Sequence, residues 1–418
     1  MFGVTEIIQG IIYFISLYYV IFWLLVLLDS DKERKKVLNK YPEVSIIIPA
    51  YNEEENIIKT IRSIQSLDYP KNKLSLIVVD DGSKDKTYEL CKDYCSKIKD
   101  FSKVIVLSQK NSGKHAAINR ALDFVKTDFF AILDADSFPA KDSLKNIIAH
   151  YDDDKIAVIT PIIKVYKPKN TIEVIQWFEY SVNHFYKSLI SKLNSLHVAP
   201  GPLSVYRTSI VKKIGGFRKA HNTEDMEIAM RIQKYNYKIV QCNDAFVYTR
   251  TPSDVKSLYK QRVRWNYGTF KNLIDYKKML FNKKYGDFGI FQLPIILLSG
   301  ILGITILFLI LYDFLKGLKP TFNMLKLYKF NIIEYFKNSQ FNIILLDIDI
   351  RALITFFVFF IITFFVILKS LKLQRNKYSF KKSGQFLLYL FYYYIFLAIV
   401  WLSVFGKQLM GKKNKWSK

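Results

Sequence analysis

The stretch from Ile7 to Leu28 constrains this chain more than any other part of its sequence. Its 22 residues carry no charge, and a helix of that length reaches about 33 Å, enough to cross the hydrocarbon core of a bilayer. A cleaved signal peptide is the alternative, but this apolar stretch is longer than a usual signal core and no basic residue precedes it. The sequence therefore predicts an N-terminal membrane anchor.

Three further apolar segments near the C-terminus predict additional spans. They are Ile290 to Tyr312, Ala352 to Leu368 and Phe386 to Gly406. The middle one has 17 residues, which is the short end for a crossing. Apolar residues concentrated in such segments account for a hydrophobic content of 50% beside 23% charged residues.

The net charge of +26 fits either a nucleic-acid-binding protein or a membrane protein with basic cytoplasmic loops. The placement of the basic residues favours the membrane, because they follow the first predicted span and fill the loop before the last one. The two clusters are Lys32, Arg34, Lys35 and Lys36, and Lys369, Lys372, Arg375, Lys377, Lys381 and Lys382. By the positive-inside rule we expect a multi-pass plasma-membrane protein with a cytoplasmic central region and no nucleic-acid partner.

The C-terminal tail does not fit this topology if all four segments cross. Four crossings would place its lysines on the outer side, and these are Lys407, Lys412, Lys413, Lys415 and Lys418. Either the last segment does not cross or the charge preference is overruled there. The sequence leaves both open.

The region between the first two predicted spans has the pattern of an α/β domain. Helical stretches such as His115 to Val125 separate short apolar runs that predict buried strands at Val44 to Ile48, Leu76 to Val79, Val104 to Leu107 and Phe129 to Leu133. This alternation predicts a mostly parallel sheet with helices on both faces. In such sheets a ligand binds beyond the carboxyl ends of the strands, where the sequence has Asn52, Glu53, Asp80, Asp81, Asp134 and Asp136.

Asp134 and Asp136 follow the apolar run that predicts the fourth of these strands. Two carboxylates two residues apart on a turn can approach one site, and their hard oxygens suit Mg²⁺ or Mn²⁺. Such a cation can bridge a diphosphate as it leaves. Either residue could instead cap a helix, so the pair alone is a weak sign of a metal site.

Four other motifs have both a structural and a functional interpretation. Asp80-Asp81-Gly82-Ser83 predicts either a capped turn or a contact to a base or ribose. Ser112-Gly113-Lys114 is like a small phosphate-binding element but lacks the rest of a P-loop. Thr223-Glu224-Asp225 predicts either a helix cap or a general base. Gln261 to Trp265 could pair arginines with a diphosphate and tryptophan with a sugar, or form a basic helix on the membrane surface.

The order of these motifs along the chain resembles the processive members of glycosyltransferase family 2, which make cellulose, hyaluronan, chitin and poly-N-acetylglucosamine. The resemblance covers Val44 to Phe270, and its span arrangement is most similar to that of bacterial poly-N-acetylglucosamine synthases. It rests on Pro49-Ala50-Tyr51-Asn52-Glu53, Asp80-Asp81-Gly82, Gly113-Lys114, Asp134-Ala135-Asp136, Thr223-Glu224-Asp225 and Gln261 to Trp265.

This resemblance implies a GT-A-type nucleotide-sugar-binding fold and an inverting single displacement, with UDP-N-acetylglucosamine as the expected donor. It implies that Asp225 is the catalytic base, with Glu224 beside it. It also implies that Asp136 and Asp134 hold Mg²⁺ or Mn²⁺. The donor pocket would then be lined by Pro49, Tyr51, Glu53, Asp80, Asp81, Lys114 and Asp134. The leaving diphosphate and the acceptor sugar would contact Gln261, Arg262, Arg264 and Trp265.

The expected organisation has four parts: an anchor over 1–30, a cytosolic transferase domain over 40–253, interfacial helices over 254–286 and a membrane region over 287–418. The growing polysaccharide would leave through the bilayer, and a partner subunit or a homodimer that helps to enclose it is left open. Two alternatives remain. One is a non-processive enzyme that adds a single sugar to a lipid carrier, and the less favoured one is a non-catalytic membrane scaffold.

Overall fold

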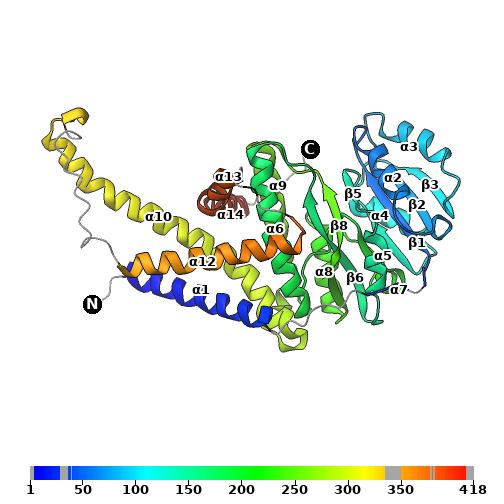
Figure 1. Ribbon diagram of the computed structural model, residues 1–418, viewed down its shortest axis with the longest axis horizontal. Helices are drawn as coiled ribbons and strands as arrows, with labels where there is room; N and C mark the ends of the chain where they lie inside the picture. Colours follow the sequence, from blue (N-terminus) through cyan, green and yellow to red (C-terminus); the bar gives the residue numbers. More distant parts are fainter. Residues whose placement is uncertain are drawn as a thin grey trace.

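The computed structural model describes residues 4–28, 36–38, 40–334, 350–376, 379 and 382–410. It contains an α/β domain built on one sheet and a set of long helices that extend from it (Figure 1). Several basic residues that the sequence analysis placed beside the predicted spans lie outside these ranges. They are Lys32, Arg34, Lys35, Lys377, Lys381, Lys412, Lys413, Lys415 and Lys418.

The sheet has eight strands in the order β3-β2-β1-β4-β7-β6-β8-β5. One half is parallel and contains the four predicted strands, β1 (Val44–Ala50), β2 (Leu74–Asp80), β3 (Lys103–Ser108) and β4 (Phe129–Ile132). The other half consists of β5 (Ser137–Pro139), β6 (Ile156–Val165), β7 (Ser204–Arg207) and β8 (Lys238–Thr249).

This second half makes the sheet mixed, but six of the eight strands run in the same direction and only β5 and β7 are reversed, so the predicted mostly parallel sheet is confirmed. β7 is antiparallel to both β4 and β6, β8 is parallel to β6, and β5 is antiparallel to β8. β5 and β7 have only three and four residues. Runs that short carry too little hydrophobic periodicity to be recognised in a sequence.

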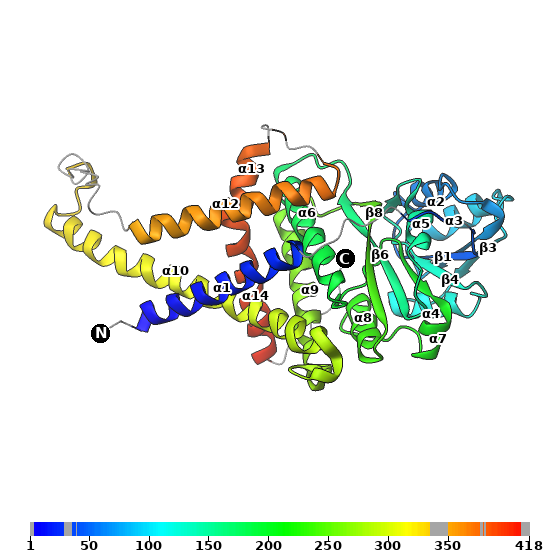
Figure 2. The same cartoon turned by 60° about the horizontal axis from the view of Figure 1, so that its bottom comes forward.

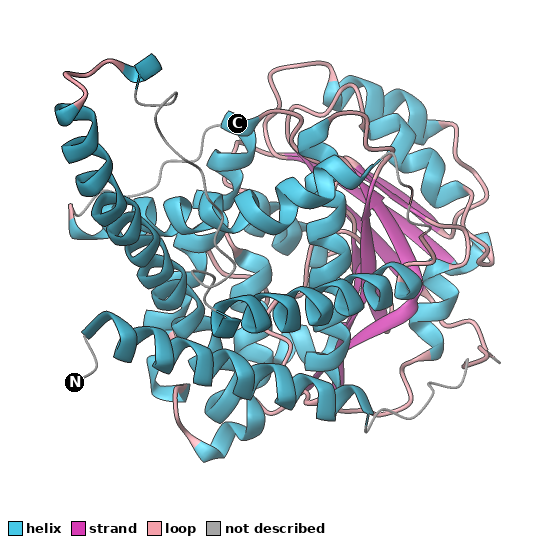
Figure 3. Cartoon of the chain, turned by 60° about the vertical axis from the view of Figure 1, so that its left-hand side comes forward, coloured by secondary structure: helices cyan, strands magenta, loops and turns pink. Residues whose placement is uncertain are grey.

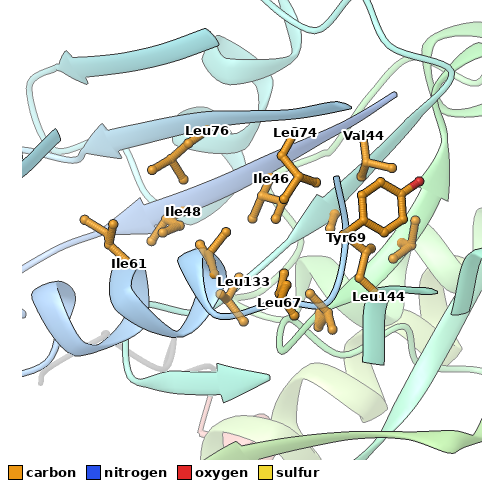
Figure 4. Packing of buried hydrophobic residues seen from close by; sticks show 14 of the residues in the cluster. Val44, Ile46, Ile48, Ile61, Leu67, Tyr69, Leu74, Leu76, Leu133 and Leu144 are labelled. Atoms are coloured by element: carbon orange, nitrogen blue, oxygen red, sulfur yellow. The ribbon is translucent and has the colours of Figure 1, made fainter. Parts of the chain in front are cut away.

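Hydrophobic clusters cover both faces of the sheet. In β1, Ile46 and Ile48 belong to one cluster and Ile47 to the other, because successive side chains of a strand point to opposite faces. Figure 4 shows the first cluster, in which Ile61 packs near Ile48. The helices of this face are α2 (Ile57–Gln65), α3 (Thr87–Ser96) and α5 (Ser143–Ala149). Those of the other face are α4 (Lys114–Leu122), α7 (Thr208–Lys213) and α8 (Glu224–Lys234).

Two helices join the sheet domain to the long helices. They are α6 (Thr171–Lys192), which begins with a capping box between Asn170 and Glu173, and α9 (Val255–Asp275), which Asp254 caps. The chain then passes through the short turns η2 (Lys277–Met279) and η3 (Lys283–Tyr285) and the π-helix η4 (Phe288–Gln292). The short 3-10 turn η1 (Lys71–Lys73) precedes β2.

The long helices gather on one side of the sheet domain, as Figure 3 shows. They are α1 (Val4–Leu28), α10 (Leu293–Leu327), α12 (Ile350–Leu373) and the continuous set α13 (Ser383–Leu388), η7 (Tyr389–Tyr393) and α14 (Tyr394–Leu409). Within the described ranges, three helical stretches are long and apolar enough to cross a membrane: Ile7–Leu28, Phe288–Leu327 and Ser383–Leu409. The predicted segment Ala352 to Leu368 is also helical, inside α12.

Candidate active site

The loops after β1 and β2 are tied together at the carboxyl edge of the sheet. The amide of Asn52 donates to the Ser83 hydroxyl at 2.9 Å, and the Asn52 side-chain oxygen accepts from the amide of Lys84 at 2.8 Å. The amide of Glu53 donates to the Thr87 hydroxyl at 2.8 Å. Asn52 adopts a φ of 53°, which asparagine tolerates better than most residues. These bonds position Tyr51 and Glu53 beside the end of β2, whereas Pro49 lies within β1.

Asp81 organises the loop that leads to Lys114. One carboxylate oxygen of Asp81 accepts from Gln109 Nε2 at 2.7 Å and from the Ser112 amide at 2.9 Å, and the other accepts from the Gly113 amide at 2.8 Å. Asp80 is also buried and accepts weakly from the Ser83 amide. Asp81 therefore shapes this edge by holding the backbone of the loop.

Lys114 stands at the start of α4 and bridges two carboxylates. Its Nζ lies 2.6 Å from Asp134 Oδ1 and 3.5 Å from Glu224 Oε1. Burial by itself would lower the pKa of Lys114, but the negative charges of Asp134 and Glu224 outweigh it and raise that pKa above its ordinary value. The cation thus joins the end of β4 to the start of α8.

Asp136 is a half-buried carboxylate just after β4. Burial raises its pKa to about 6, and the negative charges of Asp134 and Glu53 add to the shift. Within the residues that the structure describes, no three Asp, Glu, His or Cys side chains form a complete metal site. Mg²⁺, however, is commonly bound by one or two carboxylates together with substrate phosphates. The neighbouring carboxylates of Asp134 and Asp136 are the oxygen ligands that such a cation prefers.

Asp225 lies in the first turn of α8, next to Glu224. Burial and the negative charge of Glu224 raise the pKa of Asp225 to about 6, against the opposing effect of the cations of Lys114 and Arg264. The amide of Met226 donates to Asp225 Oδ1 at 2.9 Å. Asp225 is therefore a carboxylate of raised basicity that faces two cations.

Helix α9 is seated closely on the turn that precedes α8. A Cβ added to Gly268 would lie 2.3 Å from both Cγ2 and Oγ1 of Thr223. Thr223 occupies the N-cap position of α8 without capping the helix through its side chain. Its hydroxyl instead accepts from Asn272 Nδ2 at 3.0 Å. Arg264 Nη1 donates to the Asn222 carbonyl at 3.2 Å, so α9 brings Arg264 to the same turn.

Arg262, which the sequence predicted beside the diphosphate, lies on a different side of α9 from Arg264 and is paired with Glu179. It is 2% exposed and forms a buried ion pair with Glu179, in which its Nε lies 3.2 Å from Glu179 Oε1. It also donates to Gln261 Oε1, and its guanidinium carbon lies 4.3 Å from the centre of the Trp265 ring. Since helical residues two apart point about 200° from each other, the two arginines of this motif cannot share one partner.

Three residues that the sequence did not single out contribute to this arrangement. Gly201 lies against the Asp134–Lys114 pair, because an added Cβ would come within 2.3 Å of Asp134 Oδ1 and 2.6 Å of Lys114 Nζ. Gly268 permits the contact between α9 and Thr223, and Glu179 neutralises Arg262. Of these three residues, Gly201 alone had a local signal in the sequence, because it lies between two prolines at 200 and 202.

Comparison with known proteins gives this geometry a context. Residues 45–215 match the model of the family described as Glycosyl transferase family 2. A poly-beta-1,6-N-acetyl-D-glucosamine synthase of Staphylococcus epidermidis is 27% identical over 68% of this chain and 66% of that protein. A beta-monoglucosyldiacylglycerol synthase of Trichormus variabilis is 24% identical over 60% of this chain. This chain thus spans 66% and 54% of the length of these two relatives.

The fold also has a counterpart among solved structures. The mannosyltransferase PcManGT from Pyrobaculum calidifontis, determined in complex with GDP-Man and Mn²⁺, superposes with a TM-score of 0.64. The superposition covers 98% of both chains at 17% sequence identity. A likeness at that identity concerns the fold alone, and it confirms the GT-A-type architecture predicted from the sequence.

Proposed function

Because this chain carries a glycosyl transferase family 2 domain over residues 45–215, we propose that it is a membrane-embedded inverting glycosyltransferase that polymerises a sugar from a nucleotide-sugar donor. The donor that we propose is UDP-N-acetylglucosamine, and the product is a β-linked poly-N-acetylglucosamine. The observation that carries the proposal is the placement of a half-buried carboxylate, Asp225, within reach of the positive charges of Lys114 and Arg264. That arrangement offers a base for the acceptor and positive charge for the leaving diphosphate.

Asp225 acts as the general base in this proposal. Its carboxylate takes the proton from an acceptor hydroxyl while the hydroxyl oxygen forms a bond to the anomeric carbon. The bond between that carbon and the diphosphate breaks in the same step, which inverts the configuration. A pKa of about 6 leaves Asp225 ionised at neutral pH and makes it a stronger base than an exposed aspartate.

The leaving diphosphate needs compensation for its growing negative charge. Arg264 supplies a delocalised cation at the turn before α8, and Lys114 supplies a second one between Asp134 and Glu224. Preorganised charges of this kind lower the barrier because they need not reorient during the reaction. A Mg²⁺ or Mn²⁺ ion held by Asp134 and Asp136 would add positive charge at the diphosphate.

A polymer is favoured over a single transfer by the similarity to a poly-N-acetylglucosamine synthase. Trp265 also lies half-buried on α9, next to Arg264 in the sequence and with its ring centre 4.3 Å from the guanidinium carbon of Arg262. Its ring is suited to stack on the terminal sugar of a growing chain. The similarity to a glucosyldiacylglycerol synthase favours a second candidate, the transfer of one sugar to a lipid acceptor.

The test uses membranes that contain the full-length protein, Mg²⁺ and a panel of radiolabelled sugar nucleotides. Asp225→Asn removes the base, and Asp93→Asn serves as a matched control because Asp93 is an exposed residue of α3 that forms a surface ion pair with Lys97. A high-molecular-weight product from UDP-N-acetylglucosamine, made by the control and abolished by Asp225→Asn, is the expected result. Label confined to a lipid-soluble product would select the second candidate. Full activity in Asp225→Asn would refute the catalytic assignment.

A further inference from the structure

The last apolar helix packs lengthwise on α9. Val400 and Val404 of α14 are buried against Val263 and Tyr267 of α9. Nearer the start of α9, the Tyr259 hydroxyl donates to Ser403 Oγ at 2.6 Å. The rings of Phe270 and Phe405 lie 5.2 Å apart near the other end. With the ring pair of Tyr259 and Phe396, the contacts extend from Tyr259 to Phe270 on α9 and from Phe396 to Phe405 on α14, so the two helices lie side by side.

Helix α9 itself lies flat on the α/β domain. Its residues Arg264, Gly268 and Asn272 are spaced at four-residue intervals, and all contact the turn at Asn222 and Thr223. Residues at this spacing share one face of a helix. A helix that runs along the opposite side of α9 therefore runs along the surface of the domain and does not lead away from it.

The other three long helices do lead away from the domain. Among the α12 side chains that the structure describes, the buried ones lie near the C-terminal end, where Ile367 and Leu371 pack on α6, whereas Ile354 and Ile361 are exposed. α10 is buried at Leu293 and Ile296, while its later apolar side chains, such as Phe308 and Leu315, are exposed. In Figure 2, α13 and α14 run across the direction shared by α1, α10 and α12, and Figure 1 views them nearly end-on.

The partners of η7 and α14 also indicate a position outside the bilayer centre. The Tyr393 hydroxyl, just before α14, accepts from Arg262 Nε at 3.1 Å, and Arg262 is paired with Glu179. Ionised side chains are costly at the bilayer centre and tyrosines favour its interface. Tyr392 and Ile399, in contrast, are exposed, which gives the helix an apolar side that lipid can cover.

We propose that the segment from Ser383 to Leu409 does not cross the bilayer but lies in its interface, on the side of the catalytic domain, with its exposed apolar side chains in lipid. α12 then makes the third crossing, and its 24 residues reach about 36 Å. Crossings by α1, α10 and α12 place the C-terminal tail on the same side as the catalytic domain. This topology agrees with the positive-inside rule, and the conflict in the charge distribution disappears.

Cysteine labelling tests the sidedness of the full chain independently of catalysis. The three native cysteines are buried, so single reporters can be added as Asn331→Cys, as Ser379→Cys and as a cysteine appended after Lys418. A membrane-impermeant maleimide is applied to intact and to permeabilised cells. The appended cysteine is expected to behave like Ser379→Cys and opposite to Asn331→Cys. Labelling of the appended cysteine together with Asn331→Cys would overturn the proposal.

Spin-label depth measurements in vesicles test the orientation of the helix directly. Tyr392→Cys and Ile399→Cys are both exposed and seven residues apart, so a crossing helix would separate their depths by about 10 Å. Phe308→Cys and Leu315→Cys form the matched pair on α10, with the same spacing and similar exposure. We expect a depth difference of about 10 Å on α10 and nearly none on the last helix. Equal differences in the two pairs would contradict an interfacial helix.

Discussion

Replacing Gly268 by alanine is a sharp test of how α9 assembles the candidate site. The new Cβ would lie 2.3 Å from Cγ2 and Oγ1 of Thr223 and 2.9 Å from its Cβ, whereas ordinary contact begins at 3.4 Å. Thr223 is 5% exposed and its hydroxyl is bonded to Asn272, so the side chain has little room to turn away. α9 and the turn must therefore separate by about 1 Å.

The separation of α9 from this turn displaces two groups of the proposed reaction. Arg264 is carried by α9 and Asp225 follows Thr223, so the cation and the base move apart. A displacement of about 1 Å can reduce a rate by about 100-fold. We expect kcat for sugar transfer to fall by about that factor. The donor KM should change less, because Lys114 and the loops after β1 and β2 are not displaced.

The assay is sugar incorporation by purified full-length protein at saturating donor. Gly317→Ala is the matched control, because nothing lies within 4 Å of a Cβ at that position of α10, and its activity should be unchanged. Thr223→Ala removes two of the three clashing atoms, so combining it with Gly268→Ala should recover part of the lost rate. A Gly268→Ala enzyme with normal kcat, or a double variant no better than Gly268→Ala, would refute the reasoning.

Three further predictions follow from the charges of the site. Because Asp225 must be ionised and burial raises its pKa to about 6, kcat should fall as the pH drops below about 6, by about tenfold per unit; a profile flat down to pH 4.5 would contradict this role. Lys114→Met removes a cation that lowers the pKa of Asp225, so the acid limb of the same profile should move to higher pH. An unchanged acid limb would show that Lys114 does not influence the ionisation of Asp225. Arg262→Met leaves Glu179 buried without its partner and should destabilise the fold by about 3–5 kcal/mol, measured by thermal unfolding in detergent. Adding Glu179→Gln to Arg262→Met should restore most of the lost stability. A double variant no more stable than Arg262→Met would show that the unpaired charge of Glu179 is not the cause.

Local sequence patterns predicted much of this molecule. The four strands of the parallel half were predictable because continuous apolar runs such as Val44 to Ile48 are typical of strands buried on both faces. Their polar ends, at Asp80 and Asp134, could be assigned to one edge because parallel strands end on the same side. The apolar segments were recognisable by length and composition alone, which decide whether a helix can cross a membrane.

Only the tertiary structure decided which of these residues meet and in which direction the helices run. The pairing of Arg262 with Glu179 joins positions 83 residues apart, and the contact of Gly268 with Thr223 depends on how two helices approach each other. Neither leaves a trace in the local pattern. The same is true of the segment from Ser383 to Leu409, whose composition is equally compatible with a crossing and with a position along α9. Hydrophobicity specifies that a helix avoids water, but the packing partner determines its orientation.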